Sequence, residues 1–276
     1  TTTAFVRLPG VTVLVDSHCH LDCIDLSEFD NSFDRLVQDS HNAAVEHMLC
    51  VSINLKRFPE MLQKVRGYPG ISVSAGMHPI GNENEEFSIE YLTELALDEK
   101  VVAIGETGLD YFYCDKDESG KVAAELQQQR FREHIQAARQ LDKPVIVHTR
   151  DAGADTLKIL QQENADQCGG VIHCFTETRE FAGRALELGF MISFSGIITF
   201  NSADRLRSIA RSIPEDRLLI ETDSPYLAPV PHRGKQNQPA YVRHVAAALA
   251  EIRNTSMEHI IEITANNFYR LFRQAG

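Results

Sequence analysis

No apolar run in this 276-residue sequence approaches the length of about 20 residues that a membrane-spanning helix needs. The first ten residues, TTTAFVRLPG, lack the apolar core of a signal peptide, so we read 1–10 as a ragged N-terminal extension. These absences argue against a membrane protein and against secretion. They predict a cytoplasmic protein.

Cysteine pairs and positive charge are also scarce. Six cysteines occur without a CxxC pair, and a chain of this length does not need disulfides, so we expect free thiols. Lys and Arg number 27 against 39 Asp and Glu, which gives a formal net charge of −12. This excludes a protein that coats nucleic acid through a broad basic surface. An enzyme that binds a few phosphates through metal ions and a local basic loop remains compatible with it.

No linker rich in Pro, Gly or Ser divides the chain, so we predict one domain over 1–276. Short β-branched runs instead recur between longer helical patterns. These runs are almost continuously apolar, as in parallel strands that helices cover on both faces. The expected strands are 11–15, 47–53, 71–76, 101–106, 144–148, 170–175, 190–196 and 217–223.

Helical patterns lie between these strands, most clearly at 123–141, 181–189 and 203–213. Gly189 stands at a C-cap position of the second, and Pro214 stops the third. Eight strands that alternate with helices predict a (β/α)8 TIM barrel of the α/β class. An open doubly wound sheet is the alternative, but no GxGxxG fingerprint follows the first strand. No GxSxG motif surrounds Ser193 or Ser195, which argues against a serine nucleophile.

Side chains of metal-ligand type follow five of the expected strands. In VDSHCHLD, 15–22, His18 and His20 lie just past the first strand, and an i, i+2 pair on an extended chain faces one side. The carboxyl ends of barrel strands form a single rim, where active sites are built. The other four candidates are Glu106 closing the fourth strand, His148 closing the fifth, His173 near the end of the sixth and Asp223 closing the eighth.

Each of these six residues alone has an ordinary structural role as a turn, cap or core residue. Burying several ionisable groups together is costly unless a cation or other partners satisfy them, so the set predicts a metal centre. Four imidazoles and two carboxylates favour Zn, Mn, Fe or Ni. Mg prefers oxygen and water ligands and ranks below them.

Basic and aromatic residues near the same rim are candidates for substrate binding. The loop after the last strand, APVPHRGKQNQP, is stiffened by prolines, and its basic side chains suit a phosphate. The alternative for the basic residues is an ordinary role in a solvated loop or in packing at the rim. For Tyr111, stacking on a nucleic-acid base competes with packing. The candidates are His78, Tyr111, Arg150, His232, Arg233 and Lys235.

Six motifs in this order resemble the TatD family of metal-dependent hydrolases, and most closely its YcfH-like branch. They are VDSHCHLD, GETGLDYFY, KPVIVHTRDA, HCFTE, ISFSGIITF and ETDSPYLAPVPHRGK. The resemblance runs from Val15 to the C-terminus. It implies a TIM-barrel hydrolase of the amidohydrolase-like superfamily with a two-metal centre. Some members of that family are deoxyribonucleases that remove nucleotides from DNA ends.

The family pattern also implies roles for the six ligand candidates. His18, His20 and Asp223 are expected to bind one ion, His148 and His173 the second, and Glu106 to bridge two ions about 3.5–4 Å apart. Water activated between the ions would attack a phosphodiester of DNA, with Asp223 as general base. We expect a monomer that acts without a membrane.

Two other functions remain open. One is hydrolysis of another small ester, amide or phosphoester by a related barrel enzyme. Many such enzymes bridge their metals through a carbamylated lysine on the fourth strand, but VVAIGETGLD has Glu106 and no lysine. The other is a metal-binding protein without catalysis, in which closed coordination would replace the open position that catalysis requires.

Overall fold

A computed structural model of the chain describes residues 13–80, 87–114 and 118–275. The proposed N-terminal extension, 1–10, lies outside the described residues. The described residues group into two compact units. The first comprises the residues up to Leu49 together with those from Phe194 onward, and the second comprises Cys50–Ser193.

The described part of the chain contains an eight-stranded sheet in which the strands follow one another in sequence order. From β3 to β7, each strand pairs with the next one in parallel. This is the strand order of a (β/α)8 barrel, which confirms the predicted fold class, because a doubly wound sheet reverses its order at a switch point. The strands are β1 (Leu14–Cys19), β2 (Val45–Cys50), β3 (Ile71–Ala75), β4 (Val101–Asp110), β5 (Val145–Arg150), β6 (Gly170–Ile172), β7 (Met191–Phe194) and β8 (Leu218–Ile220).

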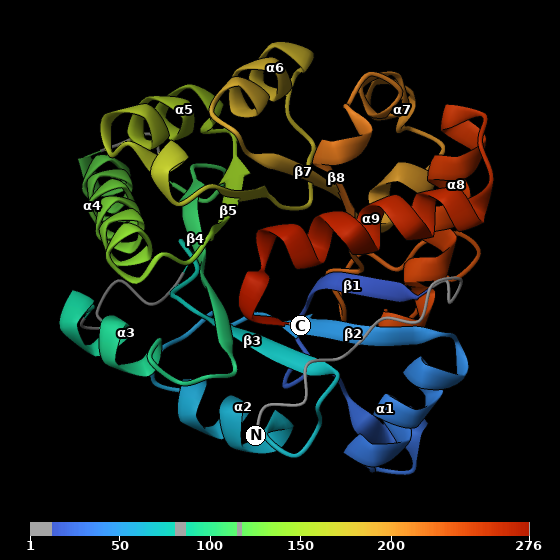
Figure 1. The fold of residues 1–276 in the computed structure, drawn as a ribbon. Coiled ribbons are helices and arrows are strands. Elements are labelled where there is room, and N and C mark those ends of the chain that lie inside the picture. The colour runs from blue at the N-terminus through green and yellow to red at the C-terminus, as the bar shows by residue number, and fades with distance from the viewer. Residues whose placement is uncertain (1–12, 81–86, 115–117, 276) are drawn as a thin grey trace. The chain divides into compact units, whose positions relative to one another are not determined.

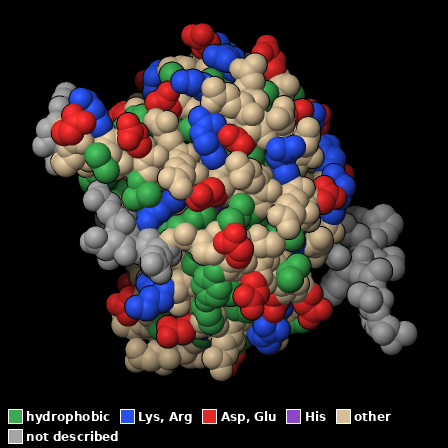
Figure 2. Space-filling view, turned by 90° about the vertical axis from the view of Figure 1, so that its left-hand side faces the viewer, with side chains coloured by type: hydrophobic (Ala, Val, Ile, Leu, Met, Phe, Trp, Pro, Cys, Tyr) green, Lys and Arg blue, Asp and Glu red, His purple; other side chains and the backbone are tan. Residues whose placement is uncertain are grey.

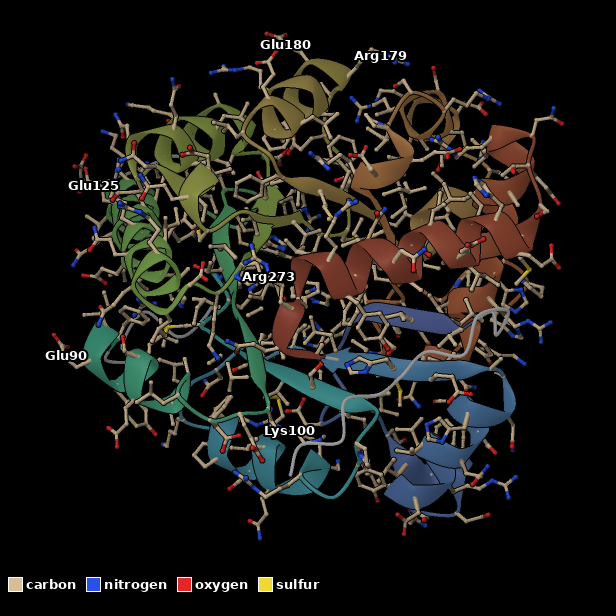
Figure 3. All side chains as sticks on the ribbon, viewed as in Figure 1. Glu90, Lys100, Glu125, Arg179, Glu180 and Arg273 are labelled. Atoms are coloured by element: carbon tan, nitrogen blue, oxygen red, sulfur yellow. The ribbon has the colours of Figure 1, made fainter. Side chains whose placement is uncertain are left out.

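In the second unit, helices cover the strands from outside. The long helix α4 packs against β4, and α5 packs against β4 and β5 (Figure 1). Ser88 and Thr178 cap α3 and α6 by accepting hydrogen bonds from backbone N–H groups of the first turn. Glu90, Glu125 and Arg179 project from their helices into solvent (Figure 3). The helices are α2 (Phe58–Val65), α3 (Ile89–Leu95), α4 (Glu118–Leu141), α5 (Gly153–Gln162) and α6 (Arg179–Glu187).

In the first unit, α9 packs against β1 and β8, and α8 packs against α9. Ser32 caps α1 and Ser256 caps α9 through their side-chain oxygens, while Asn254 ends α8 in the left-handed conformation. Apolar residues of both helices are buried, so this packing forms the core that supports β1 and β8. The helices are α1 (Phe33–Asn42), α7 (Asp204–Ala210), α8 (Val242–Arg253) and α9 (Met257–Leu271).

Several strand ends differ from those expected, and three of the differences concern ligand candidates. β1 continues through His18, and β8 stops three residues before Asp223. β4 runs to Asp110, so Glu106 lies inside this strand and does not close it. The extension follows from pairing with β5, in which Gly108 lies opposite His148. At Gly108, whose φ is +137°, a Cβ atom would approach the carbonyl oxygen of His148 to 2.0 Å, so only glycine allows this contact.

The helical expectations fit more closely. The predicted segments 123–141, 181–189 and 203–213 overlap α4, α6 and α7, and Gly189 takes the positive φ of +81° that a helix C-terminus favours. No disulfide joins the six cysteines, all of which lie in the described residues. Among the described helices, none has the length and apolar content needed to cross a membrane.

Charges of both signs are mixed on the surface. On the face shown in Figure 2, Lys and Arg side chains are interspersed with Asp and Glu, and the described residues form no continuous basic surface there. This distribution agrees with the acidic net charge of −12. Binding of an anionic polymer would therefore depend on local features.

Candidate metal centre

Three imidazoles converge on one carboxylate oxygen in the second unit. Oε1 of Glu106 lies 2.7 Å from Nε2 of His173, 3.1 Å from Nδ1 of His148 and 3.3 Å from Nε2 of His78. Glu106 is only 2% exposed. Burial alone would raise the pKa of its carboxyl, but the charges of His173 and His78 and hydrogen bonds from His148 and His173 hold that pKa well below its ordinary value. The Glu106 carboxyl is therefore held in its ionised form.

His148 contacts a second carboxylate through its other ring nitrogen. Its Nε2 lies 3.0 Å from Oδ2 of Asp110, which is fully buried. Burial lowers the pKa of His148, but the hydrogen bonds to Asp110 and Glu106 outweigh it and raise that pKa overall. A carboxylate behind a metal-binding histidine fixes the tautomer and the ring orientation. Asp110 thus leaves Nδ1 of His148 as the atom that faces the cluster.

Asp110 is held in turn by the outer helix α4. The buried side chain of Gln127 accepts a hydrogen bond from the Asp110 backbone N–H at 2.8 Å and donates one to the Asp110 carbonyl at 3.1 Å. Another α4 residue, His134, accepts a hydrogen bond from the backbone N–H of Met77, next to His78, at 3.0 Å. Its Nδ1–H donates to the carbonyl of Arg130. Polar residues of α4 therefore hold the backbone of Asp110 and of Met77, which carry or adjoin residues of the cluster.

The first unit contains a cluster of His18, His20 and Asp223. The two Nε2 atoms of the histidines are 3.3 Å apart, and Oδ1 of Asp223 lies 3.3 Å from Nε2 of His20 and 3.7 Å from that of His18. Both histidines are buried. The side chain of Asp223 is 13% exposed, so solvent reaches the carboxylate.

Backbone contacts fix Asp223 beside the two histidines. Its N–H donates to the His18 carbonyl at 2.9 Å, and the N–H of His20 donates to the Ser224 carbonyl at 2.7 Å. Asp223 adopts the left-handed conformation, with φ at +58°. Such backbone strain occurs most often at functional sites, where the surrounding contacts hold it in place.

Asp16 holds Thr222, the residue that precedes Asp223 in the chain. Its carboxyl oxygens accept hydrogen bonds from the backbone N–H and the hydroxyl of Thr222 at 2.8 and 2.6 Å. Burial raises the pKa of Asp16 to about 8, although the Thr222 hydrogen bonds oppose this. Asn237 donates to the carbonyls of Thr222 and Tyr226 from the other side of the loop. The conformation of Asp223 therefore depends on residues that sequence analysis did not single out.

The geometry of both clusters fits a divalent cation. Two imidazole nitrogens on one tetrahedral ion, each at about 2.0–2.1 Å, are about 3.3 Å apart. The His18–His20 nitrogens are separated by 3.3 Å and the His148–His173 nitrogens by 3.4 Å. One carboxylate accompanies each pair, and mixed imidazole and carboxylate donors suit Zn, Mn, Fe or Ni.

Three of the predicted substrate-binding residues lie in the second unit. His78 belongs to the Glu106 cluster and is a candidate ligand as well. The hydroxyl of Tyr111 donates to Asp155 at 3.0 Å and accepts from Gln128 at 2.7 Å, and burial raises its pKa to about 12. Arg150 is exposed, with its guanidinium carbon 3.7 Å from the centre of the Phe112 ring.

The other three lie in the loop after β8, in the first unit. His232 stacks on Tyr241 with ring centroids 3.8 Å apart, and its Nε2 lies 3.2 Å from Nε2 of His244. Arg233 and Lys235 are exposed, and the Arg233 guanidinium covers the ring of Phe200. The loop returns to Pro225 through the Asn237 N–H, two residues from Asp223. Its basic side chains thus belong to a loop that is tied to the His18 cluster.

Sequence reasoning missed the polar residues that support the ligand candidates, namely Asp16, Asp110, Gln127 and Asn237. Asp110 had a detectable signal, because it stands four residues after Glu106 in GETGLD, where i, i+2, i+4 residues of a strand share a face. Gln127 had none, since one glutamine in a polar helical pattern looks like a surface residue. Tyr226 was missed too; it is 52% exposed, and its ring centroid lies 6.1 Å from that of His20.

Histidine–carboxylate clusters carried by the strands of a (β/α)8 barrel, with one carboxylate open to solvent, define a metal-dependent hydrolase. The family model described as TatD related DNase matches residues 15–273, and the chain belongs to this family. It is 51% identical to the metal-dependent hydrolase YcfH of Escherichia coli K12 over 94% of this chain and 95% of that protein. It is 37% identical to the metal-dependent hydrolase YabD of Bacillus subtilis over 95% and 99% of the two chains.

A solved structure of a TatD homologue also matches the fold of this chain. The crystal structure of YjjV, a TatD homologue from Escherichia coli K12, superposes with a TM-score of 0.84 at 30% identity. The match covers 94% of this chain and 98% of YjjV. The resemblance noted in the sequence is therefore confirmed for the family and for the fold.

Proposed function

We propose that the chain is a two-metal phosphodiesterase that hydrolyses DNA from its ends. The observation that carries this proposal is the pair of histidine–carboxylate clusters, each with two imidazole nitrogens at the separation that one cation requires. The family description as a DNase supports DNA as the substrate. Under this proposal each cluster would hold one divalent ion, and the Glu106 carboxylate would be the ligand that the two ions share.

Divalent cations in this centre supply Lewis-acid chemistry, because they lower the pKa of water and stabilise charge on phosphoryl oxygens. Asp223 accepts the proton of the attacking water, since a carboxylate beside cations stays ionised at neutral pH. Its partial exposure of 13% gives water a path to that carboxylate. Asp110 keeps His148 in the tautomer that offers Nδ1.

Substrate phosphates are held, in this proposal, by basic side chains on segments that are joined to the clusters. Arg233 and Lys235 are exposed on the loop that is tied to Pro225, and Arg150 is exposed two residues beyond His148. Arginine binds a phosphate through two parallel hydrogen bonds, which also orients it. The strongly acidic chain needs such local contacts, because its overall charge repels DNA.

The test is hydrolysis of single-stranded DNA that is labelled at either its 3′ or its 5′ end. We expect stepwise shortening that EDTA abolishes and that Mn²⁺ or Zn²⁺ restores, with loss of activity in Asp223→Asn. Asp204→Asn, at a carboxylate that is 91% exposed, is the matched control and should cleave normally. Cleavage that continues at full rate in EDTA would contradict the two-metal mechanism.

The same preparation distinguishes the alternatives. Metal-dependent hydrolysis of small esters, amides or phosphoesters with intact DNA would identify a different substrate for the same centre. Bound metal without hydrolysis of any of these would identify a non-catalytic metal-binding protein. Light scattering during gel filtration tests the proposed monomer, and fractionation of the source cells tests the proposed cytoplasmic location.

A further inference from the structure

Two aromatic side chains lie exposed directly after β4. Phe112 is 53% and Tyr113 61% exposed, although large apolar side chains are usually buried. Their ring centroids are 4.9 Å apart at an angle of 86°, so each ring supports the other. Tyr111, which the sequence offered as one candidate for substrate binding, turns its hydroxyl to Asp155 and Gln128.

Strand pairing brings an arginine onto this aromatic pair. Asp110 lies opposite Arg150 in the β4–β5 register, and the Tyr111 N–H donates to the Arg150 carbonyl at 2.9 Å. The Arg150 guanidinium carbon lies 3.7 Å from the centre of the Phe112 ring and 5.4 Å from that of Tyr113. A guanidinium that stacks on an aromatic ring through its flat face can still donate hydrogen bonds from the N–H groups at its edge. Among the described residues, Arg150 forms no ion pair.

The three side chains are fixed relative to the Glu106 cluster. Phe112 follows Asp110 by two residues, and its N–H donates to an Asp110 carboxyl oxygen at 3.1 Å. Arg150 follows His148 by two residues on β5. Asp110 and His148 contact each other at 3.0 Å, so both strands that carry the exposed groups are joined at the cluster. A ligand on Phe112, Tyr113 and Arg150 is thereby held close to the proposed reaction centre.

Exposed aromatic rings beside a cation match the chemistry of an unpaired nucleotide. Bases stack on aromatic side chains with little dependence on their identity, and a guanidinium binds the phosphate. Paired bases in a duplex are covered by their neighbours and cannot stack in this way. We propose that Phe112, Tyr113 and Arg150 form a binding site for one unpaired nucleotide, which selects single-stranded ends. This inference rests on the proposed function and names the form of DNA that the centre receives.

The test compares ordinary single-stranded oligodeoxynucleotides with matched ones in which tetrahydrofuran residues replace the bases. Binding is measured by fluorescence anisotropy in the Asp223→Asn background, which prevents turnover. Replacing both aromatic residues by Ala should weaken binding of the ordinary oligonucleotide by about 5- to 150-fold. It should leave binding of the base-free oligonucleotide unchanged. Tyr91→Ala, at an aromatic that is 41% exposed on α3, should change neither.

A second variant separates stacking from apolar bulk and from misfolding. Leu at both positions keeps apolar volume but lacks a flat ring, so affinity for the ordinary oligonucleotide should fall as it does with Ala. Arg150→Gln should weaken both oligonucleotides and make the slope of log K against log salt shallower by about 0.7, the value for one phosphate on a single strand. Full affinity in the Leu variant, or equal losses with and without bases, would overturn the proposal.

Failure of this proposal is distinguishable from failure of the proposed function. DNA hydrolysis that persists unchanged in the Ala and Leu variants, with unchanged affinity, refutes the nucleotide site and leaves the two-metal function intact. Wild-type protein that binds single strands in a base-dependent way but cleaves none refutes the function and supports the site. Absence of base-dependent binding in the wild type refutes the site.

Discussion

Asp110 and His148 are joined by a contact of 3.0 Å between Oδ2 and Nε2, which sets the ring nitrogen that His148 turns to Glu106. Asp110 comes from the end of β4 and His148 from β5, so the contact depends on the extension of β4 beyond Glu106.

Asp110→Asn should weaken metal binding about 10- to 100-fold, because the amide no longer stabilises the tautomer that offers Nδ1. Titration of the metal-free protein with Mn²⁺ or Zn²⁺, followed by calorimetry, measures the affinity directly. Asp155→Asn is the control, since Asp155 accepts from the Tyr111 hydroxyl in the same unit. Equal affinity in Asp110→Asn and in the wild type would show that Asp110 has no role in orienting His148.

Gln127→Ala should lower the free energy of unfolding by about 1–3 kcal/mol, because it leaves the backbone N–H and carbonyl of Asp110 without their partner. It should also weaken metal binding in the same direction as Asp110→Asn. Urea unfolding measures the first effect. Gln129→Ala on the exposed face of α4, where the side chain contacts Glu133, should be nearly neutral. A neutral Gln127→Ala would contradict this role.

His18→Ala and His173→Ala should each remove one metal ion and retain the other. The reason is that His18 lies with His20 and Asp223, whereas His173 lies with Glu106 and His148. Glu106→Gln should reduce occupancy of both ions if its carboxylate bridges them. Elemental analysis of purified variants counts the ions. Unchanged occupancy of both ions in Glu106→Gln would remove the bridge from the proposal.

His134 should make stability depend on pH. Burial lowers its pKa from 6.5 to about 4 in the folded protein, so the unfolded chain binds more protons between these values. Its neutral form therefore contributes fully above pH 6.5, and the contribution is lost as pH falls toward 4, with a maximum of about 3 kcal/mol. His134→Gln should flatten the fall of the unfolding free energy between pH 7 and pH 4.5.

The exposed residue His41 provides the control for this measurement. His41→Gln should leave the pH dependence of the unfolding free energy as it is in the wild type. A His134→Gln curve parallel to that of the wild type would show that the imidazole titrates normally in the fold.

The ligand candidates were predictable because they follow apolar runs that end where polar residues begin. His18, His148, His173 and Asp223 all lie within three residues of a strand end in the structure. The end of β4 was mispredicted because Glu106, Thr107 and Asp110 look like loop residues. All three are buried within the strand, where His148 contacts both carboxylates and Gln127 binds the backbone of Asp110. Sequence patterns report hydrophobicity, but not whether a polar group has a buried partner.

The aromatic residues after β4 also show the difference between what the sequence indicates and what tertiary contacts decide. The sequence offered Tyr111 as a candidate, but it did not show that the Tyr111 hydroxyl is hydrogen-bonded while the rings of Phe112 and Tyr113, which follow it, are exposed. That distinction depends on Gln128 and Asp155, which are 17 and 44 residues away from Tyr111 along the chain.

The sequence by itself determined the family, the alternation of strands and helices and the identity of the metal-binding candidates. These follow from local hydrophobic pattern and from motifs that are contiguous in the chain. Tertiary structure alone decided which atoms of those residues face each other, which residues orient them and which aromatic rings remain exposed. The physical reason is that these properties arise from contacts between distant segments, such as Asp16 with Thr222 and Asp110 with His148.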